Sequence, residues 1–400
     1  MQIDMHYYCT YFLARTAGLP PEIASSIANS SQFVDDNTGD GELEFSDGST
    51  IHSVATAHHP SQVIANSDHD DQIRIWVPFH FYPGGEGGEG SEGSLTQMLI
   101  CIKDGKLINE AIDDHLSLAG RSFSPYLMGV VAHVYADTFS HYGFSGVGSR
   151  RNLIAGDMTI VNEDRIKGSW NGSQEDDSGV DYITDKLKNF FNKTKERSVP
   201  NFFRLMPERG SLGHGSVATY PDRPYLHWRH NWGSDNPRTD AGRFKGENKT
   251  LDRNNPETFL EGTERLHEVF IRYRDELAKA GLDGWSNDNM PAPLEYGVLR
   301  GAIKEVLEDP GDKEYRSKCW ENLAKSIFPA YGLEYDGDVA IPPYRGEEWN
   351  EAWARLKENE NRCTRKDLKG LDVWQFHRAA SVHRNYTLRQ LLPEYNVVLS

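Results

Sequence analysis

One predicted helix constrains this chain more than any other feature. The run PYLMGVVAHVYADTFSHYGF has the pattern of a helix with Ser124 as its N-cap. His133, Asp137 and His141 lie in it at intervals of four, and residues spaced in this way share one face of a helix. Because their neighbours are apolar, a polar stripe is costly here unless it is paired. The spacing favours a metal-binding stripe, and the alternatives are a hydrogen-bonded polar core and a solvent-facing stripe.

The composition indicates which metals such a stripe can bind. The chain has 15 His and 60 Asp+Glu but only 4 Cys, and no two cysteines form a CxxC pair. Nitrogen and oxygen ligands without thiolates suit zinc, iron, manganese or magnesium rather than iron–sulfur clusters. The net charge of −17 argues against a broad grip on nucleic acid or anionic membranes, because such a grip needs clustered Lys and Arg.

Hydropathy argues against a membrane bundle. Hydrophobic residues make up 38% of the chain and the mean hydropathy is −0.65. No apolar run approaches the roughly 18–20 residues of a spanning helix. The N-terminal residues do not combine a basic segment with an apolar one, so they predict no secretory signal. We therefore expect a cytoplasmic protein, with export by a signal-independent machine as the alternative, and the sequence indicates no oligomeric state.

Periodicity predicts a mainly α protein that forms one large helical domain over residues 1–400. Residues 1–230 hold the candidate ligands, and residues 255–400 are expected to pack on them as a helical C-terminal half. The expected helical segments, delimited by Pro, Gly and polar caps, cover residues 5–17, 21–35, 95–147, 179–197, 256–279, 293–308, 312–328, 347–358 and 371–392.

A small β insertion is expected near residues 42–82. A Ser-Asp-Gly-Ser turn is flanked by apolar residues on both sides, which is typical of a hairpin; these are Leu43, Phe45, Ile51 and Val54. The run QIRIWVPFHFY, residues 72–82, is the strongest strand pattern, and Pro78 makes it an edge or irregular strand. Polar, Gly-rich segments with little periodicity cover residues 84–93, 148–178 and 210–250.

The N-terminal helical hairpin holds a second set of polar residues. Asp4 and His6 lie at its start, and Asp35 and Asp36 end its second helix. Consecutive acids at a helix C-terminus oppose the helix dipole, and a bound metal would explain them. The alternative is that Asp36 only caps a turn.

Two further segments hold candidates. His80 lies between two aromatic residues of the predicted strand, where a buried histidine usually hydrogen-bonds a backbone group. His214 lies in a Gly-rich loop, whose backbone can approach a site closely. Asp222 follows and is a candidate ligand, turn former or partner of Arg223.

Other histidines carry less weight. His58 is expected at the surface, and the dipeptide His69-Asp70 matches HD-type phosphohydrolases only weakly, because they need it on a helix. His377 and His383 are six residues apart on the last predicted helix, so at most one is expected to face a site.

The order of these residues resembles the zinc-dependent phospholipase C and S1/P1 nuclease superfamily. The shared order is a His on the first helix, an Asp ending the next, a later His, a His-x3-Asp helix followed by another His, and a final His/carboxylate pair. The chain is also similar to an uncharacterised bacterial family with the motifs HYYxTYxLA…QFVDDN, VPFHFYPG and GHGxxxTYPDRPYLxW, best over residues 1–230. The resemblance implies a mostly α-helical enzyme with a trinuclear zinc site.

Carried over by position, the resemblance implies these metal ligands: His6, Asp36, His80, His133, Asp137, His141, His214 and Asp222. Some spacings differ. The superfamily places its Asp and following His six apart and its last pair four apart on a helix, whereas here the intervals are four and eight. The superfamily also uses a processed N-terminal Trp as a ligand, whereas this chain begins with Met1, and Asp4 is a candidate replacement.

These features lead to the hypothesis of a metal-dependent phosphoester hydrolase, either phospholipase C-like or a nucleotide phosphodiesterase. Two or three divalent ions, zinc by resemblance and manganese or iron as alternatives, would activate a water for attack on phosphorus. Asp4 or Asp35 would accept a proton, and Arg223 would contact a phosphate oxygen. The expected partner is a small phosphoester or phospholipid head group, docked on aromatic residues among Phe202, Phe203, Tyr225, Trp228 and Trp232.

Other functions remain open at this point. A non-catalytic, metal-stabilised interaction protein would have a saturated coordination sphere. A secreted antibacterial toxin could use the same hydrolase site. A di-iron or manganese oxidase is disfavoured, because the helices that carry the motif lack the Glu-x-x-His pairs of ferritin-like bundles.

Overall fold

The computed structural model describes residues 1–39, 41–58, 68–85, 95–162, 212–217, 219–232, 250–359, 362–368 and 370–399. In this part of the chain the protein is mainly α-helical, with one two-stranded and one three-stranded antiparallel sheet, which confirms the predicted fold class. None of the described helices is long and apolar enough to cross a membrane. The helix expected at residues 179–197 lies outside the described residues, as do Phe202 and Phe203.

A helical hairpin opens the chain, as predicted. A π-helical turn, η1 (Asp4–Cys9), leads into α1 (Thr10–Thr16), and α2 (Pro21–Asp36) runs back beside them. Gly18 ends α1 with φ +86°, the left-handed conformation that glycine adopts readily after a helix. π-Helical turns are rare and often lie at functional sites, and η1 carries His6.

The predicted hairpin is confirmed, because β1 (Gly41–Glu44) and β2 (Thr50–Ser53) pair antiparallel. The predicted strand at residues 72–82 is wrong. The chain there is helical, through α4 (His69–Asp71), the π-helical η2 (Gln72–Trp76) and α5 (Val77–Phe79).

Capping explains why this segment is helical. The Asp68 carboxylate accepts hydrogen bonds from the backbone N–H groups of Asp70 and Asp71, which starts the helix. Pro78 lies near the end of this continuous helical segment, directly after the π-helical η2, and such irregular turns often accompany a proline within a helix. The apolar residues of the run, such as Ile73 and Phe79, are buried, so the pattern marked burial rather than a strand. His69 and Asp70 are exposed on this turn.

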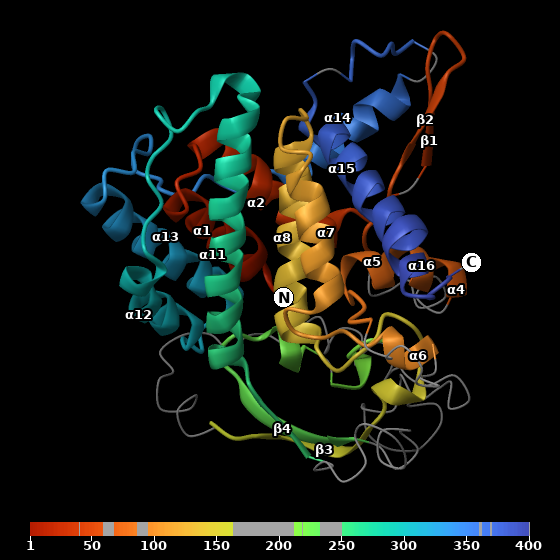
Figure 1. Cartoon of the computed structure of the whole chain (residues 1–400), viewed down its shortest axis with the longest axis vertical. Helices are drawn as coiled ribbons and strands as arrows, with labels where there is room; N and C mark the ends of the chain where they lie inside the picture. The colour runs from red at the N-terminus through yellow and green to blue at the C-terminus, as the bar shows by residue number, and fades with distance from the viewer. Residues whose placement is uncertain are drawn as a thin grey trace.

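The helix α8 (Ser124–His141) stands at the centre of the molecule, and all of its residues are buried. It contacts α2, α7 (Lys106–Leu116), α11 (Asn255–Ala280) and α15 (Asp372–Tyr386), as Figure 1 shows. The short α6 (Leu95–Met98) precedes α7. The central helix predicted from the sequence is thus the helix around which the others pack.

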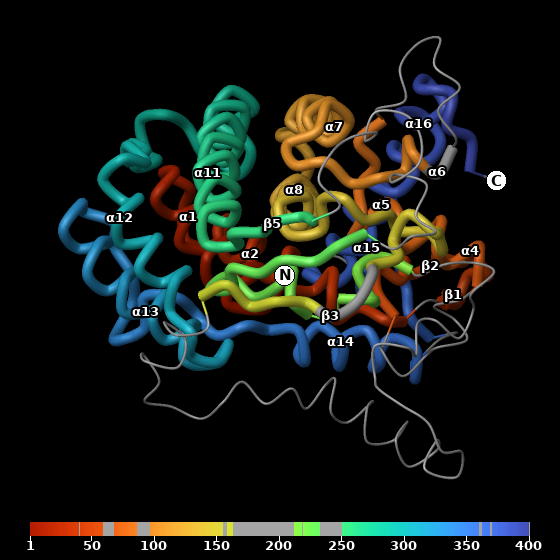
Figure 2. Tube along the Cα trace, turned by 90° about the horizontal axis from the view of Figure 1, so that it is seen from below, coloured from red at the N-terminus to blue at the C-terminus, as the bar shows by residue number. Residues whose placement is uncertain are grey.

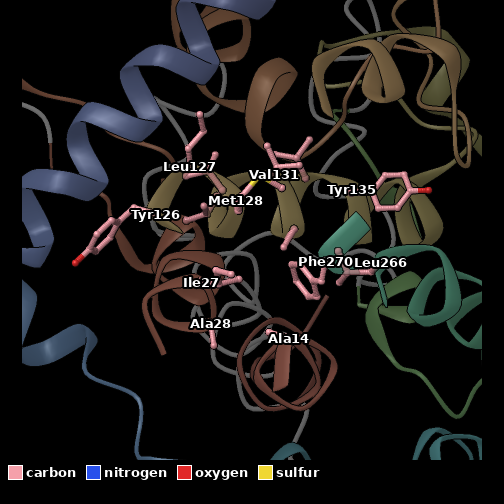
Figure 3. Close-up of a cluster of buried hydrophobic side chains, with 14 of the residues drawn as sticks. Ala14, Ile27, Ala28, Tyr126, Leu127, Met128, Val131, Tyr135, Leu266 and Phe270 are labelled. Carbon is pink, nitrogen blue, oxygen red and sulfur yellow. The ribbon is translucent and has the colours of Figure 1, made fainter. Parts of the chain in front are cut away.

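The helices α2 and α8 cross closely at Gly129. A Cβ atom at this position would lie 2.3 Å from the carbonyl oxygen of Ile27 and 2.4 Å from the Cβ of Ser30. Only glycine therefore allows this approach. Apolar side chains of α2, α8 and α11, among them Ile27, Val131 and Phe270, fill the space around the crossing (Figure 3).

The C-terminal helices lie close to their predicted positions. After α11 they are α12 (Tyr296–Leu307), α13 (Lys313–Ala330), α14 (Gly346–Glu358), α15, the π-helical η9 (Thr387–Leu391) and α16 (Leu392–Glu394). One cluster of buried apolar residues extends from Met5 to Val397. The C-terminal helices therefore share a core with the N-terminal hairpin.

A three-stranded sheet was not predicted. It consists of β3 (Ile154–Ile160), β4 (His227–Trp232) and β5 (Thr250–Asn254), with β4 in the middle; β3 and β4 lie below the lower end of α8 in Figure 1, and Figure 2 shows the sheet from below. In β4 the buried Trp228 and His230 alternate with the exposed Arg229 and Asn231. Buried and exposed residues therefore alternate along the short run HWRHNW, as they do in a strand.

This sheet is tied to the end of α8. The buried guanidinium of Arg253 on β5 donates hydrogen bonds to the carbonyls of Ser140 and Tyr142. Carbonyls in the last turn of a helix lack partners within the helix. The contact therefore holds the end of α8, where His141 lies, against the sheet.

Candidate metal centre

Side chains from five segments meet along one stripe of α8. The stripe itself supplies His133, Asp137 and His141, all buried. The other side chains are His6 from η1, Asp35 from α2, His80 from the turn after α5, and His214 and Asp222 from a segment with the 3₁₀ turns η5 (Gly215–Val217) and η6 (Tyr220–Asp222).

Among the described residues, three groups place possible ligand atoms within 4.8 Å of one another: His6, His133 and Asp137; Asp35, His80 and His133; and His141, His214 and Asp222. The Asp137 carboxylate connects them, because its Oδ2 lies 3.2 Å from His133 Nε2 and 3.4 Å from His141 Nδ1. The groups thus form one continuous cluster. Every ligand carried over from the resemblance lies in it except Asp36.

Two imidazoles are oriented by backbone carbonyls outside the cluster. His133 Nδ1 lies 2.8 Å from the carbonyl oxygen of Ser31, and His80 Nε2 lies 2.8 Å from that of Thr56. A carbonyl only accepts, so each of these ring nitrogens carries the proton. The other nitrogens, His133 Nε2 and His80 Nδ1, lie 3.3 Å from each other and 3.2 and 3.5 Å from Asp137, so a proton or a metal ion must lie between them.

His141 is oriented in the same way. Its Nδ1 lies 2.6 Å from the carbonyl oxygen of His80 and donates to it, which directs Nε2 at an Asp222 oxygen 3.0 Å away. On the other side of that carboxylate, His214 Nε2 lies 3.5 Å from Asp222. The inner surface of the cluster therefore brings ring nitrogens and carboxylate oxygens together, which is unfavourable unless protons or metal ions lie between them.

His6 and Asp137 show the same need for a cation. Both ring nitrogens of His6 and the Oδ2 atom of Asp137 are buried. None of these three atoms makes a hydrogen bond within the described part of the chain. Burial, together with His133 and the chain amine, lowers the pKa of His6 to about 3, so its ring is neutral. Burial would raise the pKa of Asp137, but His141, the amine, His133 and His6 hold it well below its usual value. Neutral imidazole and ionised carboxylate are the forms that bind metals.

The N-terminal amine of Met1 reaches this cluster. It lies 2.8 Å from Asp137 Oδ1 and 3.4 Å from Asp222 Oδ1. Burial would lower the pKa of the amine, but Asp137, Asp222 and Asp35 raise it to about 11. The aspartates thus hold a buried cation in its charged form, which shows that the field in the cluster favours positive charge.

Asp35, and not Asp36, faces the cluster, so the choice of Asp36 as a ligand is corrected. The Asp35 oxygens lie 3.8–3.9 Å from the ring nitrogens of His6, His80 and His133. The Asp36 carboxylate instead accepts hydrogen bonds from Tyr344 and Gln32. Successive residues of a helix are about 100° apart, so only one of two adjacent acids can face α8.

Asp4 is also placed differently from its predicted role. Its buried carboxylate accepts a hydrogen bond from Arg316 Nε at 2.7 Å, so it belongs to an ion pair with α13 and not to the grouped ligand atoms. Arg223, next to Asp222, donates from Nε to Thr219 Oγ1. The side chains of Tyr225 and Trp228 are buried in a small apolar cluster, so they do not form a docking surface.

A family model matches residues 1–391, and its description is a family of unknown function, DUF6765. The chain belongs to DUF6765. Neither the curated proteins nor the solved structures contain a match to it. What this DUF6765 protein does must therefore be argued from the geometry of the cluster.

Sequence reasoning missed the atoms that orient the ligands of this DUF6765 chain. The carbonyls of Ser31, Thr56 and His80 fix three rings, and backbone acceptors carry no residue-type signal. The Met1 amine had a signal, because the resemblance placed a terminal ligand there.

Proposed function

We propose that this protein is a metal-dependent hydrolase of phosphoester bonds. One observation carries the proposal: His80, His133 and His141 each donate their outer N–H to a backbone carbonyl and direct the inner nitrogen at aspartates. Histidines that bind metals usually have such an outer partner, which sets the tautomer and the ring orientation. Nitrogen and oxygen ligands suit zinc, manganese or iron, and the length of the cluster suits two or three ions.

Ions bound in this cluster would lower the pKa of a coordinated water towards neutrality and would stabilise charge on phosphoryl oxygens. Asp35 is the proton acceptor in this proposal. It is farther from the ring nitrogens, at 3.8–3.9 Å, than Asp137 is, at 3.2–3.5 Å, so it is the looser carboxylate. Its side chain is also 31% exposed, so it meets solvent and substrate first. Arg223, beside Asp222, would bind a phosphate oxygen.

A small phosphoester is the substrate that these features favour. The net charge of −17 opposes the approach of a long polyanion. A lipid in a membrane would need an exposed apolar surface for docking, but Trp228 and Tyr225 are buried. We therefore propose a single phosphate group or head group as the reacting part of the substrate.

Metal analysis combined with a substrate panel tests this function. Protein purified without chelators should contain divalent metal and should hydrolyse at least one chromogenic phosphomonoester or phosphodiester. His80→Gln should lose most metal and activity, whereas His52→Gln, at an exposed position of β2 outside the cluster, should keep both. A wild-type protein without metal, or equal activity in the two variants, would refute the proposal.

A structural metal centre is the second candidate, because His6, His133 and Asp137 are almost fully buried. Closed coordination is typical of metals that stabilise a fold. If chelation lowers the melting temperature and no phosphoester in the panel is hydrolysed, this second function replaces the first.

A further inference from the structure

A second pair of histidines lies between helices α7 and α15, outside the candidate metal centre. His115 and His383 are both fully buried, and His115 Nε2 lies 3.1 Å from His383 Nδ1. At one end, His115 Nδ1 lies 2.9 Å from Asp114 Oδ2, and at the other, His383 Nε2 lies 2.9 Å from the carbonyl oxygen of Pro78. These contacts form a continuous relay from a carboxylate that is 39% exposed to the backbone of α5.

Counting protons shows that this relay carries a positive charge. Its two ends, an ionised carboxylate and a carbonyl, can only accept hydrogen bonds. The three links between them therefore need three N–H groups, whereas two neutral imidazoles supply only two. One of the two rings must be an imidazolium if all three links are made.

The outer partners favour this charge on His115, because its Nδ1 lies against a carboxylate whereas the outer partner of His383 is a neutral carbonyl. Burial, the neighbouring His115 and His133 on α8 lower the pKa of His383 to about 3, so His383 is the neutral ring. The other titratable groups against the pair are two phenols, Tyr82 beside His383 and Tyr386 beside His115. Burial raises the pKa of both phenols, so both stay neutral. Asp114 is then the anion that pairs with the His115 imidazolium.

The far end of the relay lies two residues from a candidate ligand. The Pro78 carbonyl lies in the last turn of α5, where carbonyls lack partners within a helix, and His383 donates to it. His80 follows this turn and directs Nδ1 into the metal centre. The ring of His383 also packs against Phe79, with centroids 5.7 Å apart.

We propose that Asp114, His115 and His383 form a charged relay that positions the turn carrying His80 at the metal centre. The outer N–H of His80 already binds the Thr56 carbonyl, so the relay fixes the backbone on which this ring is mounted. It would make α15, near the end of the chain, a positioning element for the site. The positioning role rests on the metal centre of the proposed function, whereas the charge of the relay can be tested without it.

The charge is tested by NMR on the full-length protein with ¹⁵N-labelled histidine. Asp114→Asn removes the anion and keeps the size of the side chain, and Asp113→Asn is the matched control, because Asp113 is the exposed neighbour that pairs with Arg272. At about pH 8, well above the ordinary histidine pKa of about 6.5, wild type and Asp113→Asn should each show an imidazole with both nitrogens protonated. Asp114→Asn should lose it. Absence of this signal in wild type, or its persistence in Asp114→Asn, overturns the relay.

The positioning role is tested in the same samples. The imidazole resonances of His80, assigned with His80→Gln, should shift in Asp114→Asn and not in Asp113→Asn. The affinity for Zn²⁺, measured by competition with a chromophoric chelator, should fall in Asp114→Asn by up to about tenfold. Loss of a residue that contacts a metal ligand directly lowers metal affinity by about tenfold or more, and this relay acts less directly. Unchanged His80 resonances together with unchanged affinity overturn the positioning role. Failure of wild type to bind zinc would instead contradict the proposed function, while the NMR readouts still decide the relay.

Discussion

The helix crossing beneath the candidate metal centre gives the sharpest mutational prediction, Gly129→Ala. The new Cβ would lie 2.3 Å from the Ile27 carbonyl oxygen, whereas carbon and oxygen in contact prefer about 3.3 Å or more. The atom met is backbone, so α2 and α8 must separate by roughly 1 Å. Overpacking of this kind costs about 1–3 kcal/mol, and alanine recovers at most about 1 kcal/mol of helix propensity. We expect a net loss of about 1–2 kcal/mol in unfolding free energy.

The same separation should damage the site. Ser31 and Asp35 on α2 lie 2.8 and 3.8 Å from the ring of His133, which is one turn after Gly129 on α8. Functional groups need to be held within about 0.5 Å of their working positions. Loss of the Ser31 contact should weaken metal binding by about tenfold or more, the usual effect of removing an outer partner of a ligand.

Urea denaturation and zinc competition measure the two effects. Gly301→Ala is the matched control, because this glycine lies exposed in α12 and its Cβ would meet nothing within 4 Å. It should stabilise the protein by up to about 1 kcal/mol through helix propensity alone. A Gly129→Ala protein that is as stable as wild type and binds zinc equally well would contradict the expected clash at the crossing.

Three further predictions follow from buried charges and rings. Asp35→Asn should reduce metal binding and hydrolysis, whereas Asp36→Asn should keep both, because Asp36 bonds Tyr344 instead; equal loss in the two variants would contradict the assignment. A lysine at position 316 cannot keep the hydrogen bonds to both Asp4 and Gln2. Arg316→Lys should therefore lower the unfolding free energy, measured by urea denaturation, by about 1–3 kcal/mol, and weaken zinc binding through His6, which is close to Asp4. Unchanged stability would contradict the role of this ion pair. Burial lowers the pKa of His377 to about 3, and its Nδ1 accepts a hydrogen bond from Val54 N–H. Its contribution is complete above pH 6.5 and is lost as the pH falls towards 3, by about 2 kcal/mol at pH 5. The loss of unfolding free energy between pH 7 and 5 should therefore be smaller by about that amount in His377→Gln, and equal losses would contradict the sign.

The fold was predictable where one periodicity dominates. The α8 stripe is four-spaced and apolar between its polar residues, so its helix and the helices after residue 255 lie near their predicted positions. Residues 72–79 were not predictable in this way, because alternating burial of Ile73 and Ile75 suits a strand, and the cap at Asp68 decides for a helix. The central strand β4 is only six residues long, between segments of little periodicity.

The residue types of the candidate site were more predictable than the contacts that orient them. Spacing placed His133, Asp137 and His141 on one face, but two adjacent acids cannot be separated by spacing, and Asp35 rather than Asp36 faces the cluster. The carbonyls that orient the rings come from residues far apart in sequence, such as Ser31, so only the tertiary structure brings them together.

In the proposed function, the ring nitrogens and carboxylates of this cluster surround metal ions. An anomalous-scattering map from crystals of protein purified without chelators tests it most directly. We expect peaks about 2.0–2.2 Å from His133 Nε2 and His80 Nδ1, and near His141 Nε2 and Asp222. A map that resolves these side chains and contains no anomalous peak among them, after zinc has been supplied, would contradict it.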